Sequence, residues 1–194
     1  MEVLGANISD LDGVLKGCKS DSVKHKEMLY KGYYGYLKGV ILRYVQDYQS
    51  VEELVNDSFV KIFNNISSFN AANNNGQTDL VKSFRSWVAR IASRTAIDFL
   101  RKKKISFVDA EINDASLPAV APTEPMYASD ARDIMKLLDE LTDLQKMIFN
   151  LYEIEGFSHD EISRMLSIRQ SVSRSYLSRA KQKLKDLYFK KILN

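Results

Sequence analysis

Residues 158–180, SHDEISRMLSIRQSVSRSYLSRA, contain two helix patterns that are separated by a short turn. Ser158 and Glu161 form a capping-box pattern, in which a serine oxygen and a glutamate three residues later satisfy the first N–H groups of a helix. Ile162 and Leu166 then give that helix a buried face. After the turn, one apolar face of a longer helix is traced by Val172, Tyr176, Ala180, Leu184 and Leu187. This order predicts a helix-turn-helix unit.

The residues before this unit predict one more helix of the same domain. Thr142 and Gln145 make a second capping-box pattern, and Gly156 lies where the helix is expected to end. The buried positions of this helix are Leu144, Ile148 and Leu151. We therefore expect residues 130–194 to form a small helical domain.

Residues 106–129 differ in composition from the rest of the chain. They include all three prolines and four acidic residues, but no lysine or arginine. Such a stretch is typical of an extended linker. We expect a flexible acidic linker here, between a domain at residues 1–105 and the domain at residues 130–194.

The first domain also has helical spacing, and strand alternation is scarce. A helix is expected from about residue 22 to residue 44. Glycines interrupt it and are interpreted as points of close helix packing: Gly32, Gly35 and Gly39. Ser50 and Glu53 resemble a further capping box. The helix that follows is expected to bury Val51, Leu54, Val55, Phe59, Ile62 and Phe63. The predicted fold class is all-α, with two small helical domains joined by a linker.

The composition argues against several kinds of site. A single cysteine, Cys18, cannot form an internal disulfide, and two distant histidines, His25 and His159, offer no zinc cluster. No basic N-terminal segment precedes an apolar core, and no stretch approaches the ~20 apolar residues of a membrane span. We expect a cytoplasmic protein that needs no metal, cofactor or small-molecule substrate.

Charge is strongly separated along the chain. Residues 82–104 and residues 169–191 each contain eight basic residues and one acidic residue. The rest of the chain has 12 basic and 23 acidic residues. Two basic segments on an acidic body indicate a polyanion bound at two places, although two solvated helix faces are the alternative.

In the first basic segment, Trp87 flanks a stripe of Arg90, Arg94 and Arg101. An aromatic ring beside arginines suits nucleic acid with exposed bases, because bases stack on the ring and phosphates pair with the charge. Equally, Trp87 could be the rim of the core. In the second segment, residues near the start of the last helix would reach base edges in the major groove, or form a charged surface.

The segment 47–57 is acidic and has no basic residue. Neither a calcium-loop pattern nor a nearby histidine supports a metal or catalytic site there. This face is interpreted as solvated, or as a docking surface for a basic protein. A nucleic-acid enzyme would need clustered carboxylates or histidines, and Asp98 alone among the bases of 82–104 is too little.

Together these motifs resemble extracytoplasmic-function (ECF) sigma factors, the small two-domain specificity subunits of bacterial RNA polymerase. Region 2 of that family is matched by residues 29–34 (LYKGYY), 51–59 (VEELVNDSF), 84–92 (FRSWVARIA) and 96–101 (AIDFLR). Region 4 is matched by residues 138–141 (LDEL), 155–162 (EGFSHDEI) and 173–180 (SRSYLSRA). The order of both halves, with this linker between them, is highly specific.

The resemblance and the charge pattern together give three sets of site residues. The resemblance implies docking on the clamp helices of the polymerase β′ subunit through Glu52, Glu53 and Asp57, and the acidic segment adds Asp47. For the −10 element the resemblance implies Trp87, Arg90 and Arg94, and the first basic segment adds Arg85, Arg101 and Lys102. For the −35 element the resemblance implies Arg174, Ser175, Ser178 and Arg179, and the second basic segment adds Arg169, Gln170 and Lys181. The implied partners are core polymerase (β′ clamp helices and β flap), promoter DNA and an anti-sigma factor, which in this family is frequently membrane-bound.

Some positions depart from the family pattern. Members commonly have asparagine in place of Arg94, and glycine in place of Ser167 and Ser171. These differences concern promoter choice and not the class of activity. The predicted function is that of a non-catalytic sigma factor. The alternative is a helix-turn-helix regulator that binds duplex DNA without joining polymerase, which would leave Trp87 with Arg90 unexplained.

Overall fold

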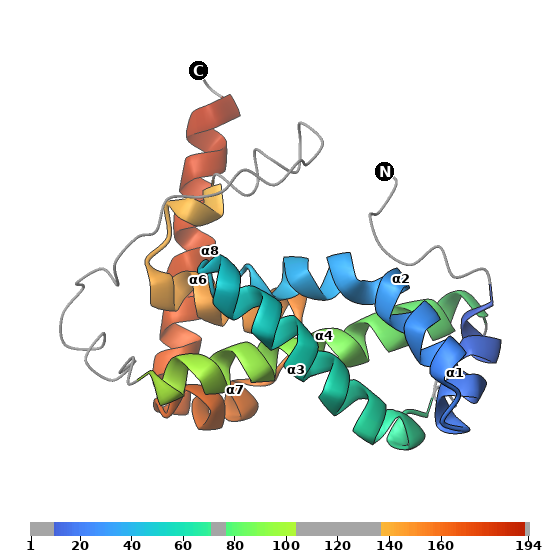
Figure 1. Cartoon of the computed structure of the whole chain (residues 1–194). Helices are drawn as coiled ribbons and strands as arrows, with labels where there is room; N and C mark the ends of the chain where they lie inside the picture. The colour runs from blue at the N-terminus through green and yellow to red at the C-terminus, as the bar shows by residue number, and fades with distance from the viewer. Residues whose placement is uncertain (1–9, 71–76, 104–136, 193–194) are drawn as a thin grey trace. The chain divides into compact units, whose positions relative to one another are not determined.

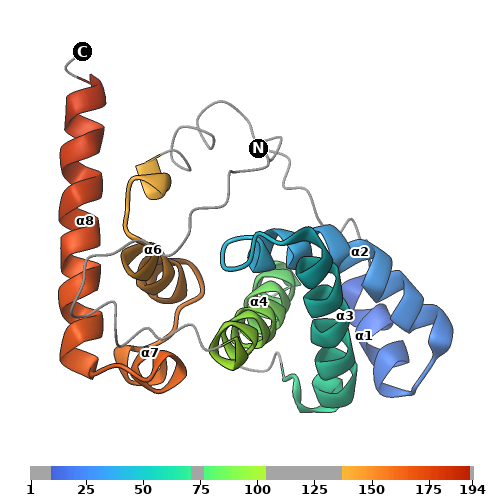
Figure 2. The ribbon, with the colours of Figure 1, turned by 60° about the vertical axis from the view of Figure 1, so that its left-hand side comes forward.

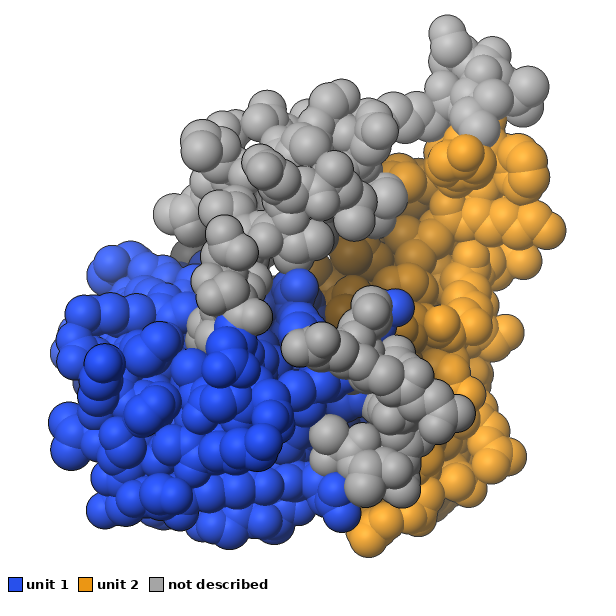
Figure 3. Space-filling model, turned by 90° about the vertical axis from the view of Figure 1, so that its right-hand side faces the viewer, with its two compact units in different colours: residues 1–99 blue, residues 100–194 orange. Residues whose placement is uncertain are grey.

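The computed structural model describes residues 10–70, 77–103 and 137–192, and every regular element in these ranges is a helix (Figure 1). The all-α prediction is therefore confirmed. The chain divides into two compact units, residues 1–99 and residues 100–194 (Figure 3). The expected linker at 106–129 lies outside the described residues, so the domain limits at 105 and 130 stay a prediction.

Unit 1 contains α1 (Leu11–Lys19), α2 (Val23–Ile41), α3 (Tyr48–Asn65), the short helix η1 (Ile66–Ser68) and α4 (Gln77–Lys102), whose last residues pass the boundary of the unit. Helices α1 and α3 both pack against α2 (Figure 2). Each of them buries one apolar face. The expected stripe on α3 is confirmed for Val51, Leu54, Val55, Phe59 and Ile62, which are buried, whereas Phe63 is only partly buried.

Helix α3 begins earlier than the sequence predicts, and the predicted capping box at Ser50 is wrong. The carboxylate of Asp47 accepts a hydrogen bond from the backbone N–H of Ser50 at 2.9 Å and caps the helix. Ser50 is a buried residue inside the first turn. Both patterns place an oxygen three residues before a free N–H, and the more N-terminal oxygen is the one that caps the helix.

Two of the three glycines of α2, Gly35 and Gly39, are not points of close packing, and for Gly32 close packing stays a prediction. A Cβ atom added at Gly35 or Gly39 would meet no atom within 4 Å. Close approach occurs instead at Gly17 of α1, where an added Cβ would lie 2.2 Å from the ring of His25. The short connection between α1 and α2 brings these two residues together, which helical spacing alone does not predict.

Unit 2 contains α6 (Asp143–Phe149), the π-helical turn η3 (Asn150–Ile154), α7 (His159–Leu166) and α8 (Gln170–Ile192). Both predicted capping boxes are confirmed, at Thr142 with Gln145 and at Ser158 with Glu161. Gly156 ends the first helical segment with a left-handed φ of 70°. The predicted core residues Ile148, Leu151 and Ile162 are fully buried.

The buried face of α8 is rotated relative to the prediction. Ser173, Leu177 and Ala180 are buried, whereas Val172 and Tyr176 are only partly buried. Apolar spacing did not predict this face, because its first buried residue is a serine. The hydroxyl of Ser173 can be buried since it has a hydrogen-bond partner, His159, within unit 2. Before α8, Ser167 adopts the left-handed conformation, with φ 56° and ψ 36°, in the turn that joins α7 to α8.

No helix among the described residues is long and apolar enough to cross a membrane.

Candidate nucleic-acid interfaces

Trp87 of α4 lies at the edge of an aromatic cluster in unit 1. Its ring centroid is 5.2 Å from that of Phe69 and 5.7 Å from that of Phe84. Phe84 is fully buried and makes an edge-to-face contact with Tyr33 at 5.0 Å. Trp87 itself is only partly buried. The indole therefore belongs to the rim of the core and still presents surface to a ligand.

The arginines of α4 do not all share one face. At roughly 100° per residue, Arg90, Arg94 and Arg101 lie within about 60° of Trp87, whereas Arg85 is about 160° away. The guanidinium of Arg85 instead stacks over the ring of Tyr36 on α2, 4.5 Å from its centroid. On α4, Trp87 therefore lies on the same side as the stripe of three arginines, and Arg85 lies on another side.

A basic residue that the sequence patterns do not single out, Lys61, also lies against α4. Lys61 of α3 donates a hydrogen bond from Nζ to the hydroxyl of Thr95 on α4 at 2.9 Å. Lys61 stands outside both basic segments of the sequence, and only the packing of α3 against α4 brings its charge to this helix. The remaining predicted residues at the end of α4, Arg101 and Lys102, are exposed in its last turn.

The turn of unit 2 is held by contacts between α7 and α8. Nδ1 of His159 lies 2.9 Å from the buried hydroxyl of Ser173, and the imidazole stacks on Tyr152 at 4.4 Å. Burial lowers the pKa of His159, and the positive charges of Arg174 and Lys181 lower it further. In addition, the Ser163 hydroxyl donates a hydrogen bond to the carbonyl of Ile168 at 2.7 Å.

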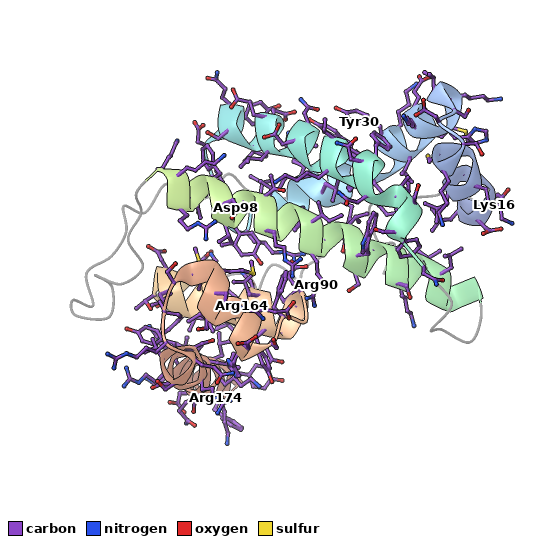
Figure 4. All side chains as sticks on the ribbon, turned by 90° about the horizontal axis from the view of Figure 1, so that it is seen from below. Lys16, Tyr30, Arg90, Asp98, Arg164 and Arg174 are labelled. Carbon is purple, nitrogen blue, oxygen red and sulfur yellow. The ribbon has the colours of Figure 1, made fainter. Side chains whose placement is uncertain are left out.

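Most of the predicted −35 residues are exposed at the start of α8 or just before it: Arg169, Gln170, Arg174, Ser175, Ser178 and Arg179. Helix α8 thus offers a polar, basic surface on the side away from its buried row (Figure 4). Lys181 differs from this group. Its ammonium pairs with Glu153 of η3 and lies over the ring of Tyr152, 6.0 Å from the centroid.

The acidic face of α3 is also divided. Glu52 accepts a hydrogen bond from Lys38 at 2.7 Å and another from the hydroxyl of Tyr34. These two donors lower the pKa of Glu52, and the bond to Glu52 raises the pKa of Tyr34 to about 12. Asp47 caps the helix. Glu53 and Asp57 are exposed on the same helix.

Metal-binding geometry is absent from the described ranges, where no group of three or more histidine, cysteine or acidic residues comes together.

Two family models match this chain. The model described as Sigma-70 region 2 matches residues 29–105, and the model described as Sigma-70, region 4 matches residues 131–184. ECF RNA polymerase sigma factor SigM of Bacillus subtilis is 23% identical over 161 residues, which cover 82% of this chain and 93% of SigM. ECF RNA polymerase sigma factor SigE of Mycolicibacterium smegmatis is 25% identical over 139 residues, which cover 70% of this chain but only 50% of SigE.

A solved structure shares the fold. The sigma factor RpoE of Bartonella quintana, in a co-crystal structure with the anti-sigma factor NepR, has a TM-score of 0.50 and 22% identity. The match covers 86% of this chain and 98% of RpoE. Two helical units, the second with a helix-turn-helix, define a two-domain sigma factor of the region 2 and region 4 type. The chain belongs to the sigma-70 family, among its ECF sigma factors.

Proposed function

We propose that this protein binds core RNA polymerase, directs it to specific promoters and helps to open the −10 region. The observation that carries this proposal is the pairing of a partly exposed Trp87 with the arginine stripe on α4, in a chain that has a second basic helix in a separate unit. A regulator that binds only duplex DNA has no use for the first of these surfaces.

The −10 surface would act on unpaired bases. A base can stack on the open side of the Trp87 indole, while Arg90 and Arg94 neutralise phosphates of the same strand. Arg101 and Lys102 at the end of α4 would add phosphate contacts. Arg85 has a different role, since its guanidinium is stacked on Tyr36 and supports the packing of α4 on α2.

The −35 surface would lie at the start of α8. Arg174 and Gln170 are the residue types that read guanine and adenine in the major groove, and Ser175, Ser178 and Arg179 lie further along the exposed side. Lys181 is bound to Glu153 and would contribute less. Each unit alone would bind weakly, and a linker between them would raise the effective concentration of the second contact.

The acidic face of α3 would dock on a basic surface of the polymerase, the β′ clamp helices, through Glu53 and Asp57. Glu52 would shape this face through its bonds to Lys38 and Tyr34. Asp47 would serve mainly as the helix cap. Binding of region 4 to the β flap belongs to the same proposal.

The protein would have no catalytic activity, because the polymerase performs the reaction, and it would act in the cytoplasm, where core polymerase and promoters are found. We also expect control by an anti-sigma factor. The relative from Bartonella quintana was crystallised with such a partner, NepR.

The experiment that tests the function is genome-wide run-off transcription in vitro, with core polymerase of the source bacterium, with and without this protein. New RNA starts that share −35 and −10 motifs are the expected result. If no start depends on the protein while it binds duplex DNA tightly alone, the sigma function is wrong and the regulator function replaces it.

A further inference from the structure

Helix α1 is part of the core of unit 1, although it precedes the residues that the region 2 model matches. Its buried side chains, Leu11, Val14, Leu15 and Cys18, pack this helix against α2 and η1. Figure 2 shows α1 beside α2. Because α1 is packed in this way, its residues have fixed positions relative to α2 and η1.

Lys19, the last residue of α1, makes a contact with a residue 50 positions later. Its Nζ donates a hydrogen bond to the backbone carbonyl of Phe69 at 3.0 Å. Phe69 follows η1 and has extended backbone angles, φ −67° and ψ 118°, so its carbonyl has left the helical hydrogen-bond pattern. Its N–H still donates to Ile66 at 3.2 Å. Lys19 therefore fixes Phe69 through its backbone carbonyl, which accepts no helical hydrogen bond at this point of the chain.

The ring of Phe69 in turn supports Trp87. It lies 5.2 Å from the indole at an interplanar angle of 43°, and 5.2 Å from Phe84 at 78°. Phe69 is buried. The indole thus rests on two rings. One of them, Phe84, is set in the core of the unit, and the other is anchored by Lys19.

We propose that Lys19 is a positioning residue for Trp87: through Phe69, it holds the indole at the angle at which an unpaired base can stack. This inference rests on the proposed function, which gives Trp87 its contact with the −10 strand. Lys19 itself touches no DNA. A ring that is already held in place binds a base with higher affinity than a ring that becomes ordered only on binding. The entropy lost on ordering the side chain has then already been lost during folding.

Trp87 is the chain's one tryptophan, so intrinsic tryptophan fluorescence reports on this ring alone. The test variant is Lys19→Ala in the full chain. Lys19→Arg keeps a donor at the same place. Lys16→Ala is the matched control, because Lys16 lies on the same helix and pairs with Asp12 one turn away, at an exposed site. Acrylamide quenching of the protein without DNA, affinity for core polymerase, and open-complex formation on a promoter found by run-off transcription are measured for each.

Lys19→Ala is expected to make the indole more accessible to acrylamide and to lower open-complex formation about fivefold, the factor that one lost hydrogen bond typically brings. Affinity for core polymerase stays as in the wild type, and Lys19→Arg and Lys16→Ala behave like the wild type. Unchanged quenching in Lys19→Ala would overturn the positioning role. So would changed quenching with open complexes at the wild-type level. A wild-type protein that opens no promoter would overturn the proposed function, and the role of Lys19 with it.

Discussion

Lys38 of α2 and Glu52 of α3 form an ion pair at 2.7 Å, which joins the two helices at their outer edge. The hydroxyl of Tyr34 donates a second hydrogen bond to the same carboxylate. Glu52 is therefore held by partners within unit 1, whereas its neighbours on the acidic face, Glu53 and Asp57, are exposed. The acidic residues of α3 look alike in sequence, but Glu52 stabilises the packing of α2 and α3, whereas Glu53 and Asp57 are available to a partner protein.

From this difference we predict that the double variant Glu53→Gln, Asp57→Asn lowers affinity for core polymerase and leaves the melting temperature unchanged. Glu52→Gln is expected to lower the melting temperature, because Lys38 loses its charged partner. Binding to immobilised core polymerase and thermal unfolding measure the two effects. Core affinity that depends on Glu52 and not on the other two residues would reverse the assignment.

Substitutions of Trp87 should separate its packing from its contact with DNA. Trp87→Ala removes ring contacts with Phe69 and Phe84 and is expected to lower the stability of unit 1 by about 2 kcal/mol, in the range for truncation of a partly buried aromatic residue. Trp87→Phe keeps a ring in place and is expected to retain most of the stability, while open-complex formation falls because a smaller ring stacks less strongly. Denaturant unfolding and permanganate footprinting of the −10 region give the two quantities. Full promoter opening by Trp87→Ala would show that the indole is only structural.

Arg174 and Lys181 are both basic residues of α8, and they should respond differently to removal. Arg174→Ala is expected to weaken binding of the holoenzyme to its −35 element by roughly 1 to 3 kcal/mol and to relax base preference at one position. Lys181→Ala should have a smaller effect, because its ammonium is paired with Glu153. Competition binding with −35 variants at two salt concentrations tests this difference. Equal losses for the two variants would place Lys181 on the DNA as well.

Stability of unit 2 is expected to fall below neutral pH because of His159. Burial and two nearby positive charges hold the pKa of His159 below its ordinary value of 6.5, so the unfolded chain binds a proton more readily than the folded one. The stability that the neutral imidazole gives is thus fully present above pH 6.5, and it is lost as the pH falls through the folded pKa. The melting temperature is measured between pH 8 and pH 5. It should depend less on pH in His159→Gln than in the wild type, and His25→Gln in the other unit is the control. An unaltered pH profile in His159→Gln would contradict this role.

Two positions with a left-handed backbone should respond in opposite directions. Gly156→Ala is expected to destabilise unit 2 by about 1 kcal/mol, because φ is 70° there, although an added Cβ would meet no atom within 4 Å. Ser167→Gly is expected to stabilise it by roughly 0.5 kcal/mol, since relief of strain at φ 56° exceeds the added entropy of the unfolded chain. Denaturant unfolding measures both. A stabilised Gly156→Ala variant would be incompatible with this account of the turn.

Much of this protein follows from local patterns in its sequence. The capping boxes at Thr142 and Ser158, the apolar row on α3 and the helix end at Gly156 were all predictable, because each depends on residues within a few positions of one another. The resemblance to a two-domain sigma factor is likewise carried by motifs in the linear chain, and the family models match both halves.

Other features depend on contacts between residues far apart in the chain, and for these local patterns had no signal. The rotation of the buried face of α8 comes from Ser173, which becomes a core residue through His159. The separation of Arg85 from the other arginines comes from Tyr36 on another helix. Lys19 reaches Phe69 across 50 residues. Periodicity tells which side of a helix is apolar, but the partner of a polar or charged side chain is set by the packing of the helices in three dimensions.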